Sequence, residues 1–309
     1  MIDPLVSVVV VSYNSSSTII ETLDSISAQT YTNIELIIAD DASTDNTVEI
    51  CKTWLTKHIN RFVDARVITT SNNTGVSANA NRGYNNAHGV WIKVIAADDA
   101  LNDDCVKEFV DYCSNNTNAK VIVSNCDRYL ELFEEPCKME AQKQPLAVTL
   151  SQNNPSLLHD LLCYGHNFMV APTMFIKKEV FDSLGGYDED FPMCEDYPFW
   201  LKLTGAGIPV YYIDKVLVKY RITKRSLSNC VINKVFDDRD IDTRLKIYNK
   251  YIKGTTKRSI SFHALSDLYI KKLFMCLNLN RDSFICRCLY GAVRLPISIR
   301  ERIVFHKYL

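Results

Sequence analysis

The sequence predicts an α/β fold in which a mostly parallel sheet carries a ligand site at one edge. Apolar segments at residues 5–11, 34–39 and 90–97 have the length and unbroken hydrophobicity of buried strands. Polar or acidic residues follow each segment directly, and helix-like stretches separate the segments. Because parallel strands of such folds end at the same edge, these polar clusters should meet where open α/β sheets bind their ligands.

Length and composition limit the kinds of fold and function that this protein can have. A chain of 309 residues has room for one large α/β domain and a smaller addition. The formal net charge of -1 argues against wholesale nucleic-acid binding, since no general positive field attracts phosphates. Eleven cysteines without any C-x-x-C favour buried reduced thiols over a zinc site. No basic leader and no apolar stretch of roughly 20 residues is found, so we expect a cytoplasmic protein.

Four strands and three helices should alternate within the first hundred residues, which is the βαβ pattern. Thr18 and Glu21 have capping-box spacing at the start of the first helix. Either Ser43 or Asp45 should cap the second helix, and Gly89 should end the third. The strands are expected at residues 5–12, 34–39, 65–70 and 91–97.

The remainder of the chain is less regular. Residues 130–150 predict an extended loop or hairpin, and further strands are expected at 167–176 and 208–220. From about residue 226 charged helices follow, and residues 251–309 contain 11 Lys and Arg against 3 Asp and Glu. A helical extension is therefore expected after the α/β domain.

Asp98 and Asp99 follow the fourth strand with no basic residue beside them. Two adjacent carboxylates are hard oxygen ligands that suit Mn²⁺ or Mg²⁺ held together with substrate phosphates. The alternative is that one aspartate only caps the next helix, near Asp104. Two aspartates in succession at an apolar edge favour a metal site over a helix cap.

Two other acidic pairs are candidate site residues. Asp40 and Asp41 end the second strand, where a carboxylate can accept hydrogen bonds from a uracil ring or from ribose. Residues 43–45 instead fit a turn and a helix cap.

Glu195 and Asp196 precede an aromatic helix. Apolar neighbours and a second carboxylate raise the pKa of such a pair, which suits a general base, and a helix N-cap is the alternative.

Further motifs complete the pattern. They are VVVVSYN at 8–14, S-x-x-x-QTY at 25–31, DDASTD at 40–45, N-x-G at 73–75 and 81–83, GGYDE at 185–189 and ED at 195–196. Together with the Asp98-Asp99 pair, this ordered set resembles the inverting GT-A glycosyltransferases of family 2 over residues 5–228. The resemblance implies a GT-A domain at 1–228, with a nucleotide-sugar-binding half at about 1–100 and an acceptor half at about 101–228. A basic, mainly helical extension at 229–309 follows.

The resemblance also implies a role for each matching residue. Asp196 is the general base, and Glu195 supports it or contacts the acceptor. Asp98 binds the ribose, and Asp99, with Asp98, holds Mn²⁺ or Mg²⁺ on the diphosphate. The donor-binding residues are Val11, Tyr13, Asp40, Asp41, Asn73, Gly75, Asp98 and Arg221.

Three positions depart from the family pattern. Ala96 stands where many members carry a leading Asp, Ala80 where an Arg is frequent, and Thr223 where some members have a His. Only the last two carboxylates of the metal motif therefore remain. Residues 224–226 (Lys-Arg-Ser) are expected to cover the diphosphate instead.

The implied reaction is inverting transfer of a hexose from a UDP-sugar to a hydroxyl of a polyprenyl-diphosphate-linked saccharide, which forms a β-linkage in O-antigen or capsule synthesis. A nucleotidyltransferase of similar architecture is one alternative, but residues 13–17 lack the Gly and Lys of a phosphate loop. A catalytically inactive nucleotide-sugar-binding protein is the other alternative.

The C-terminal extension mixes basic and apolar residues in the way that interfacial helices do. This predicts contact with the inner face of the cytoplasmic membrane, because anionic headgroups attract basic side chains. The alternative is that these helices only pack on the catalytic domain. The arginines concerned are Arg281, Arg287, Arg294, Arg300 and Arg302.

Overall fold

The computed structural model describes residues 3–165, 167–223, 234–237 and 241–306, which form two compact units. Unit 1 comprises Met1–Gln144, Met169–Phe199 and Pro209–Ile222. Unit 2 comprises Pro145–Phe168, Trp200–Ile208 and Thr223–Leu309. The units do not simply divide at residue 228, because two internal segments belong with the C-terminal helices.

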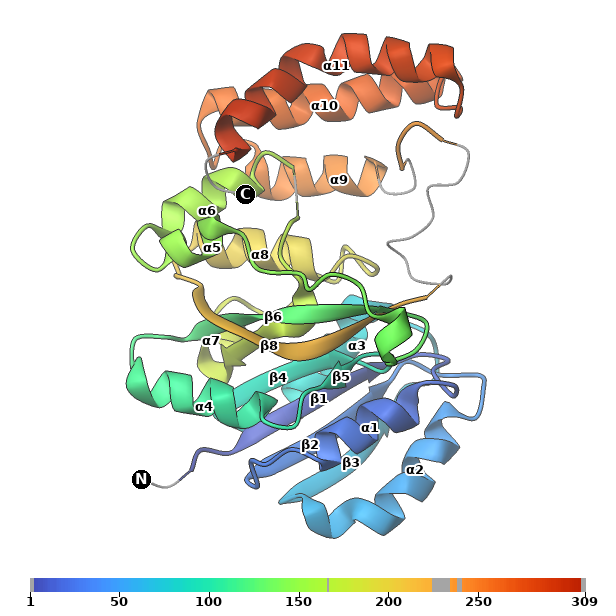
Figure 1. The fold of residues 1–309 in the computed structure, drawn as a ribbon, viewed down its shortest axis with the longest axis vertical. Coiled ribbons are helices and arrows are strands. Elements are labelled where there is room, and N and C mark those ends of the chain that lie inside the picture. The colour runs from blue at the N-terminus through green and yellow to red at the C-terminus, as the bar shows by residue number, and fades with distance from the viewer. Residues whose placement is uncertain (1–2, 166, 224–233, 238–240, 307–309) are drawn as a thin grey trace. The chain divides into compact units, whose positions relative to one another are not determined.

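Within the described residues, unit 1 is built on one 8-stranded mixed sheet in the order β3-β2-β1-β4-β7-β6-β8-β5 (Figure 1). The first four strands pair in parallel, which confirms the predicted βαβ order of the first hundred residues. β7 runs antiparallel to both β4 and β6, β8 is parallel to β6, and β5 is antiparallel to β8. The strands are β1 (Val6–Ser12), β2 (Ile34–Asp40), β3 (Asp64–Thr69), β4 (Trp91–Ala96), β5 (Ala100–Leu101), β6 (Val121–Leu130), β7 (Met174–Lys177) and β8 (Tyr211–Ile222).

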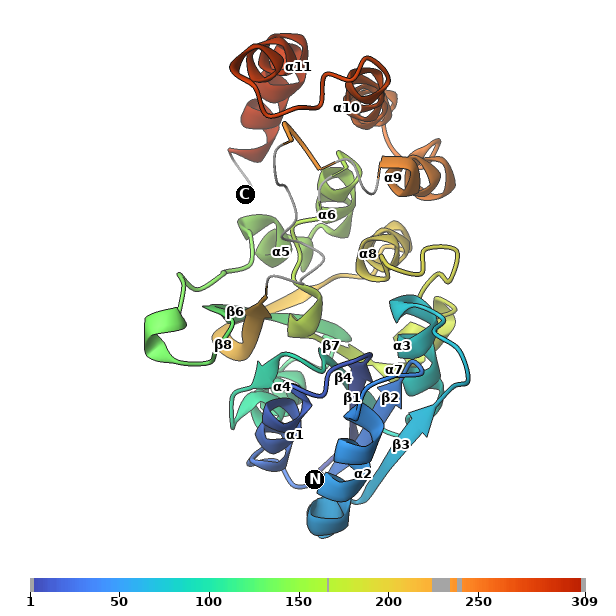
Figure 2. The ribbon, with the colours of Figure 1, turned by 90° about the vertical axis from the view of Figure 1, so that its right-hand side faces the viewer.

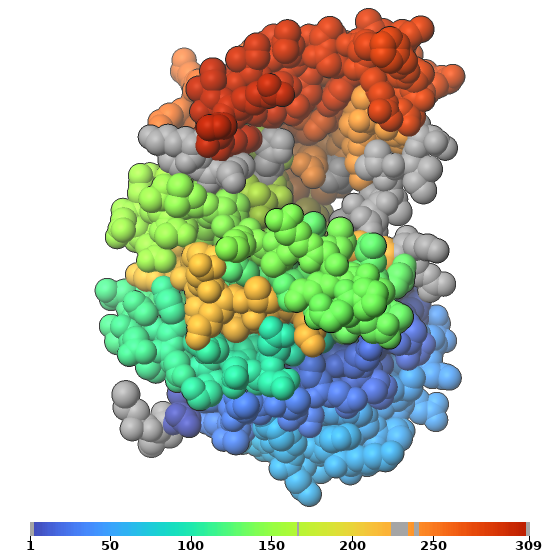
Figure 3. All heavy atoms as spheres, viewed as in Figure 1, coloured from blue at the N-terminus to red at the C-terminus, as the bar shows by residue number. Residues whose placement is uncertain are grey.

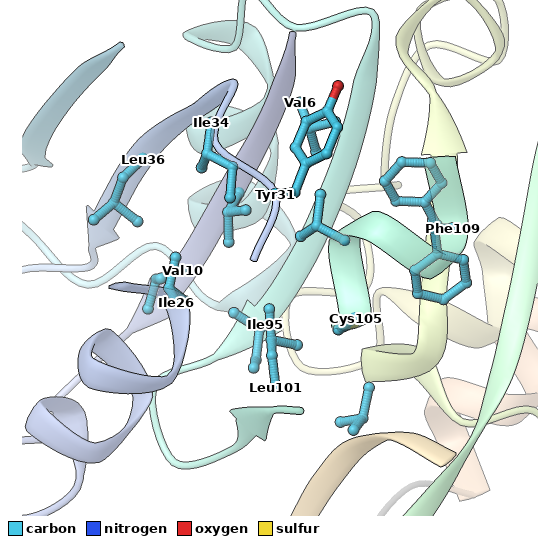
Figure 4. Close-up of a cluster of buried hydrophobic side chains, with 14 of the residues drawn as sticks. Val6, Val10, Ile26, Tyr31, Ile34, Leu36, Ile95, Leu101, Cys105 and Phe109 are labelled. Atoms are coloured by element: carbon cyan, nitrogen blue, oxygen red, sulfur yellow. The ribbon is translucent and has the colours of Figure 1, made fainter. Parts of the chain in front are cut away.

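Helices cover both faces of this sheet (Figure 2). α1 (Ile19–Ser27), α2 (Thr47–His58) and α4 (Cys105–Asn115) pack on the face formed by alternate strand residues such as Val8 and Val10. Figure 4 shows part of this core, in which Val10 and Leu36 of two strands lie near Ile26 of α1. β1 and β2 are almost wholly buried, so their apolar runs are unbroken, as expected of parallel strands between two helical layers, whereas the edge strand β3 is only partly buried.

The opposite face of the sheet carries α3 (Val76–Asn85) and α7 (Lys178–Ser183). Gly83 of α3 lies so close to β1 that a Cβ there would be 2.4 Å from Cγ1 of Val9. Tyr84 stacks on Phe181 of α7 with the ring centroids 3.9 Å apart. The small-residue composition of α3 therefore serves close packing of this helix on the sheet.

Local signals predicted the helix ends only approximately. The cap predicted at Ser43 or Asp45 is wrong, because the N-cap of α2 is Asn46; the carboxylate of Asp45, one residue earlier, accepts the N–H of Thr47 at 3.0 Å. The capping box is wrong, because the Thr18 hydroxyl donates to the carbonyl oxygen of Ala97 at 2.9 Å and makes no cap hydrogen bond. Gly89 does not end α3 either, since the helix stops at Asn85.

The region after α4 contains a strand that the sequence patterns did not predict, β6. The loop or hairpin expected over residues 130–150 is confirmed in part, because it pairs back on β6 through isolated bridges, Cys126 with Gln142 and Tyr129 with Lys138. It ends in a short helix, α5 (Leu146–Ser151), within unit 2.

Unit 2 consists largely of helices, which agrees with the helical character expected of the C-terminal region. A buried ion cluster joins two of them: Arg294 of α11 contacts Asp267 of α10 at 2.6 Å and Glu301 at 2.9 Å. None of the helices in the described part of the chain is long and apolar enough to cross a membrane. Besides α5, the helices are α6 (Pro155–Leu162), α9 (Ile241–Ile247), the π-helical turn Tyr248–Ile252, α10 (Arg258–Cys276), α11 (Phe284–Phe305), and the end of α8 (Asp196–Gly205), whose first residues belong to unit 1.

At the start of β2, the buried carboxylate of Glu35 joins three segments of unit 1. It accepts hydrogen bonds from the Ser7 hydroxyl at 2.5 Å, the His88 N–H at 2.9 Å and the Arg66 guanidinium at 2.9 Å. Burial alone would raise the pKa of Glu35, but these hydrogen bonds outweigh burial and lower the pKa below its ordinary value. The carboxylate therefore stabilises the fold above the pKa of the unfolded chain, and this contribution is lost as the pH falls through the lower folded pKa.

We expect Glu35→Gln to lower the melting temperature by several degrees at pH 7, because hydrogen bonds to a buried charge contribute about 1.5–3 kcal/mol each. The difference from wild type should shrink as the pH falls below about 4, where Glu35 of the unfolded chain is already protonated. Thermal unfolding at both pH values measures this. Glu49→Gln, an exposed carboxylate on α2, is the matched control. An equal loss at both pH values would show that shape, and not charge, is what Glu35 contributes.

Candidate active site

The parallel strands bring the first group of predicted site residues to one edge of the sheet. Ser12, the last residue of β1, is in register with Asp40 of β2, and Val11 is in register with Ala96 of β4. Tyr13 comes directly after β1, and 46% of its surface is exposed. The loops that follow β1, β2 and β4 therefore form one continuous rim, as expected from their parallel arrangement.

Asp40 ties two of these loops together. Its buried carboxylate accepts hydrogen bonds from the N–H of Ser43 at 2.8 Å and from the hydroxyl of Ser12 at 3.1 Å. Asn14 adds a second link, because its side-chain oxygen accepts the N–H of Thr44 at 2.8 Å. Asp40 thus shapes the loop that would face a nucleotide, and its own contact with a ligand stays a prediction.

Asp41 holds the start of α3. Its carboxylate is buried and accepts hydrogen bonds from the N–H groups of Thr74, at 2.9 Å, and Gly75, at 2.7 Å. These are donors at the helix N-terminus, where a negative charge is also favoured by the helix dipole. Arg82, to which no sequence motif assigns a role, lies 3.4 Å from the same carboxylate. Asn73 is exposed and its side-chain oxygen accepts the Gly75 N–H at 3.2 Å.

The two aspartates after β4 have different surroundings. Asp98 is half-buried, whereas Asp99 is 1% exposed and accepts the N–H of Arg221 at 2.9 Å. Burial, and next the charge of Asp98, raise the pKa of Asp99 well above its ordinary value. Neither aspartate caps the next helix, because α4 starts only at Cys105, after Asp104. The capping alternative is therefore wrong.

Burial raises the pKa of Asp98 as well, so the clear difference between the two aspartates is exposure. Asp98 is the one that a cation could reach from the rim, and its role as a metal ligand stays a prediction. No group of three or more His, Cys, Asp or Glu side chains among the described residues is arranged to hold a metal. A divalent ion would therefore depend on Asp98 together with the phosphates of a substrate, which is the usual way that Mg²⁺ is held.

Arg221 supports the loop after β4. It is 3% exposed, and its Nε donates to the carbonyl oxygen of Asp98 at 2.7 Å. Its two terminal nitrogens bind the carbonyl oxygen of Glu131 and the carboxylate of Glu21. Because each nitrogen of the guanidinium is engaged, the geometry favours a supporting role over the predicted contact with the donor. The residues expected to cover the diphosphate, 224–226, lie outside the described residues.

The Glu195-Asp196 pair lies at the start of α8. Glu195 is half-buried, and burial, followed by the charge of Asp196, raises its pKa to about 7. Of the two carboxyls, Glu195 is therefore the one whose proton affinity is raised to the range that suits a general base at neutral pH. Asp196 is the first residue of α8 and accepts the N–H of the next residue, Tyr197, at 2.6 Å, whereas an N-cap side chain binds the second or third helical N–H. The ring of Tyr187 packs against Phe199 of α8, with centroids 5.1 Å apart.

Comparison with known proteins identifies the family of this chain. The family model for Glycosyl transferase family 2 matches residues 7–185. The chain belongs to this family. It is 30% identical over 258 residues to an uncharacterized glycosyltransferase of Haemophilus influenzae, an alignment that covers 81% of this chain and 73% of the relative. It is 27% identical over 228 residues to the Escherichia coli UDP-Glc:alpha-D-GlcNAc-diphosphoundecaprenol beta-1,3-glucosyltransferase WfaP, covering 72% of this chain and 80% of WfaP.

Solved structures of TarS from S. aureus share the fold. One superposes with a TM-score of 0.61 at 17% identity, covering 87% of this chain but only 43% of TarS. A shorter form, TarS 1-349 in complex with UDP-GlcNAc, has a TM-score of 0.61 at 18% identity and is covered to 73%. These likenesses confirm the GT-A fold with a C-terminal helical region. The family match and the relatives show that the chain is a glycosyltransferase, so the nucleotidyltransferase alternative is wrong.

Proposed function

We propose that this glycosyltransferase transfers a hexose from a UDP-sugar to a hydroxyl of a lipid-diphosphate-linked sugar, with inversion, in the assembly of a bacterial surface polysaccharide. The observation that carries the proposal is the Glu195-Asp196 pair at the start of α8, in which burial and the neighbouring Asp196 raise the pKa of Glu195 to about 7. The printed activity of WfaP, a glucosyltransferase that acts on a diphosphoundecaprenol-linked sugar, supports this acceptor class. The UDP and UDP-GlcNAc complexes of TarS support a UDP-sugar donor.

The donor is proposed to lie over the rim formed by the loops after β1, β2 and β4. The exposed ring of Tyr13 offers an aromatic face for stacking on a base. Asp41, Asn73 and Gly75 form the adjoining turn, and Asp40 and Val11 set the position of the loop beside it.

Mn²⁺ or Mg²⁺ fits this rim if Asp98 is its protein ligand, since Asp98 is the accessible carboxylate after β4. When bound, such an ion neutralises negative charge that develops on the departing diphosphate. Asp99 contributes from the interior, where its carboxylate accepts the Arg221 N–H and so keeps the loop in place.

In the proposed chemical step, the carboxylate of Asp196 accepts the proton of an acceptor hydroxyl. The hydroxyl oxygen forms a bond to the anomeric carbon as the bond from that carbon to the diphosphate oxygen breaks on the opposite face. An α-linked UDP-hexose therefore gives a β-linked product. Glu195 raises the proton affinity of the pair, because two neighbouring carboxylates do not ionise independently.

A lipid-linked acceptor requires access to a membrane surface, and α11 supports contact with the inner face of the cytoplasmic membrane. Its outward stripe is apolar, with Ile285 70% and Ile303 74% exposed, and α11 lies at the surface of unit 2 (Figure 3). Fewer arginines are available than the sequence suggested. Arg294 lies in the buried ion cluster and Arg300 lies over the ring of Tyr164, which leaves Arg281, Arg287 and Arg302 exposed. An apolar stripe beside basic residues is typical of an interfacial helix.

Asp196→Asn should lower kcat by about 10²-fold or more and change the Kd of UDP little, because loss of a base acts on the chemical step. The wild-type kcat/KM should fall below pH about 7, because Glu195, the neighbour of the proposed base, takes up a proton there. UDP release from UDP-glucose and UDP-GlcNAc, with a GlcNAc-diphospho-lipid acceptor, measures both. Asp190→Asn, an exposed aspartate of the same loop, is the control. A wild type that binds UDP without turnover would instead support the inactive binding protein.

Asp98→Asn should abolish the Mn²⁺-dependent part of UDP binding, measured by calorimetry with MnCl₂ or with EDTA. Asp99→Asn should retain it, because an Asn oxygen can still accept the Arg221 N–H in the interior. The opposite result, with Mn²⁺ dependence lost only in Asp99→Asn, would restore Asp99 as the metal ligand.

The full-length protein should co-sediment with vesicles that contain phosphatidylglycerol and much less with pure phosphatidylcholine. Replacing both Ile285 and Ile303 by Gln should reduce this binding at least several-fold. Val63→Gln, at an exposed valine of unit 1, is the matched control. If wild type ignores anionic vesicles at low salt, the C-terminal helices serve only the fold.

A further inference from the structure

The loop that leads to the Glu195-Asp196 pair is bound to α3 by a side chain that has no assigned role. The amide oxygen of Asn81 accepts the N–H of Tyr187 at 2.8 Å. Its nitrogen donates to the carbonyl oxygen of Tyr187 at 3.0 Å and to the carboxylate of Glu189 at 2.8 Å. Both ends of one amide therefore hold the backbone of the loop, which fixes its orientation as well as its distance.

A second contact lies one turn earlier on α3. The buried hydroxyl of Ser77 donates to the carbonyl oxygen of Phe191 at 2.6 Å, and its N–H donates to that of Pro192 at 3.3 Å. Gly75, just before the helix, approaches Pro192 so closely that a Cβ there would lie 2.6 Å from it. The loop is thus in contact with α3 along two turns up to residue 192, shortly before Glu195.

The same first turn of α3 is held from the other side by Asp41, which binds the N–H groups of Thr74 and Gly75. One helix end therefore supports the rim proposed to bind the nucleotide and the loop that carries the proposed base.

We propose that Asn81 and Ser77 are positioning residues of the transferase reaction: they hold the base in register with the donor and contact neither substrate. This inference rests on the proposed function. A misplacement of about 1 Å can lower a rate by two orders of magnitude without weakening binding. Loss of either side chain should therefore reduce turnover and leave donor affinity unchanged.

Two neighbouring glycines allow a matched test. Gly185 and Gly186 have nearly equal positive φ angles, 70° and 68°, so an alanine is strained to a similar degree at either position. A Cβ at Gly186 would lie 2.7 Å from the Asn81 side-chain oxygen and 3.2 Å from the Phe181 ring, whereas a Cβ at Gly185 would meet nothing within 4 Å. Gly186→Ala therefore disturbs the Asn81 contact, and Gly185→Ala reproduces the backbone strain without that disturbance.

The experiment compares Asn81→Ala, Ser77→Ala and Gly186→Ala with Gly185→Ala and with Asn85→Ala, an exposed asparagine of α3. UDP release from UDP-glucose or UDP-GlcNAc is measured well below each melting temperature, together with the Kd of UDP. The first three variants should lose about tenfold or more in kcat, with the donor KM and the UDP Kd within twofold of wild type. The two controls should keep the wild-type kcat.

Three results would overturn the inference. A lower melting temperature with normal kcat would make Asn81 and Ser77 purely structural, and equal losses in Gly185→Ala and Gly186→Ala would assign the effect to backbone strain. A rise in the UDP Kd that accounts for the lost activity would assign them to donor binding. If wild type itself transfers no sugar from any UDP donor, the proposed function fails, and that outcome is distinct from these three.

Discussion

The buried carboxylate of Asp41 at the N-terminus of α3 is the contact around which the rim of the sheet is organised. It accepts the N–H groups of Thr74 and Gly75, the two residues before the first helical residue, at 2.9 and 2.7 Å. Removing it would leave the Gly75 N–H with only the longer hydrogen bond to Asn73 and would take a negative charge away from the positive end of the helix dipole. The turn after β2, through Asp41, and the loop before α8, through Phe191 and Pro192, both contact this helix end. Their mutual arrangement therefore depends on a charge that the fold has buried.

A second buried charge lies under the loop after β4. Lys93 is wholly buried, burial lowers its pKa to about 8, and its ammonium donates to the carbonyl oxygens of Met174 and Pro172. The charge of Lys93 in turn opposes the rise in the pKa of Asp99. Unit 1 thus combines a buried lysine, a buried aspartate and the guanidinium of Arg221 around one loop. Well-packed hydrophobic residues in these positions would often make the fold as stable or more stable. The buried charged groups are therefore best explained by the geometry that their contacts impose on the loop.

The fold was predictable from the sequence because buried parallel strands leave an unmistakable pattern. β1 and β2 are apolar without interruption, and polar residues mark their ends. The errors arose where a distant partner decides the role of a side chain. Thr18 has capping-box spacing, yet its hydroxyl bonds Ala97 across the sheet edge, and Glu21 pairs with Arg221, two hundred residues away. Likewise, no local signal distinguishes Asp98 from Asp99, because only the packing of β8 beside that loop makes one of them interior.

The departure of this chain from the common metal motif has a physical consequence for donor binding. With Ala96 in place of a leading Asp and Asp99 in the interior, the accessible negative charge of that loop is carried by Asp98. A divalent ion bound there, as proposed, would gain most of its affinity from the phosphates of the ligand itself. In the proposed donor complex, recognition would then rely more on contacts of the rim with the nucleoside. Asp40 and Asp41 each accept several hydrogen bonds, and these bonds hold the rim in place before a ligand binds. A rim that is already ordered loses less entropy on binding, which strengthens its contacts with the nucleoside.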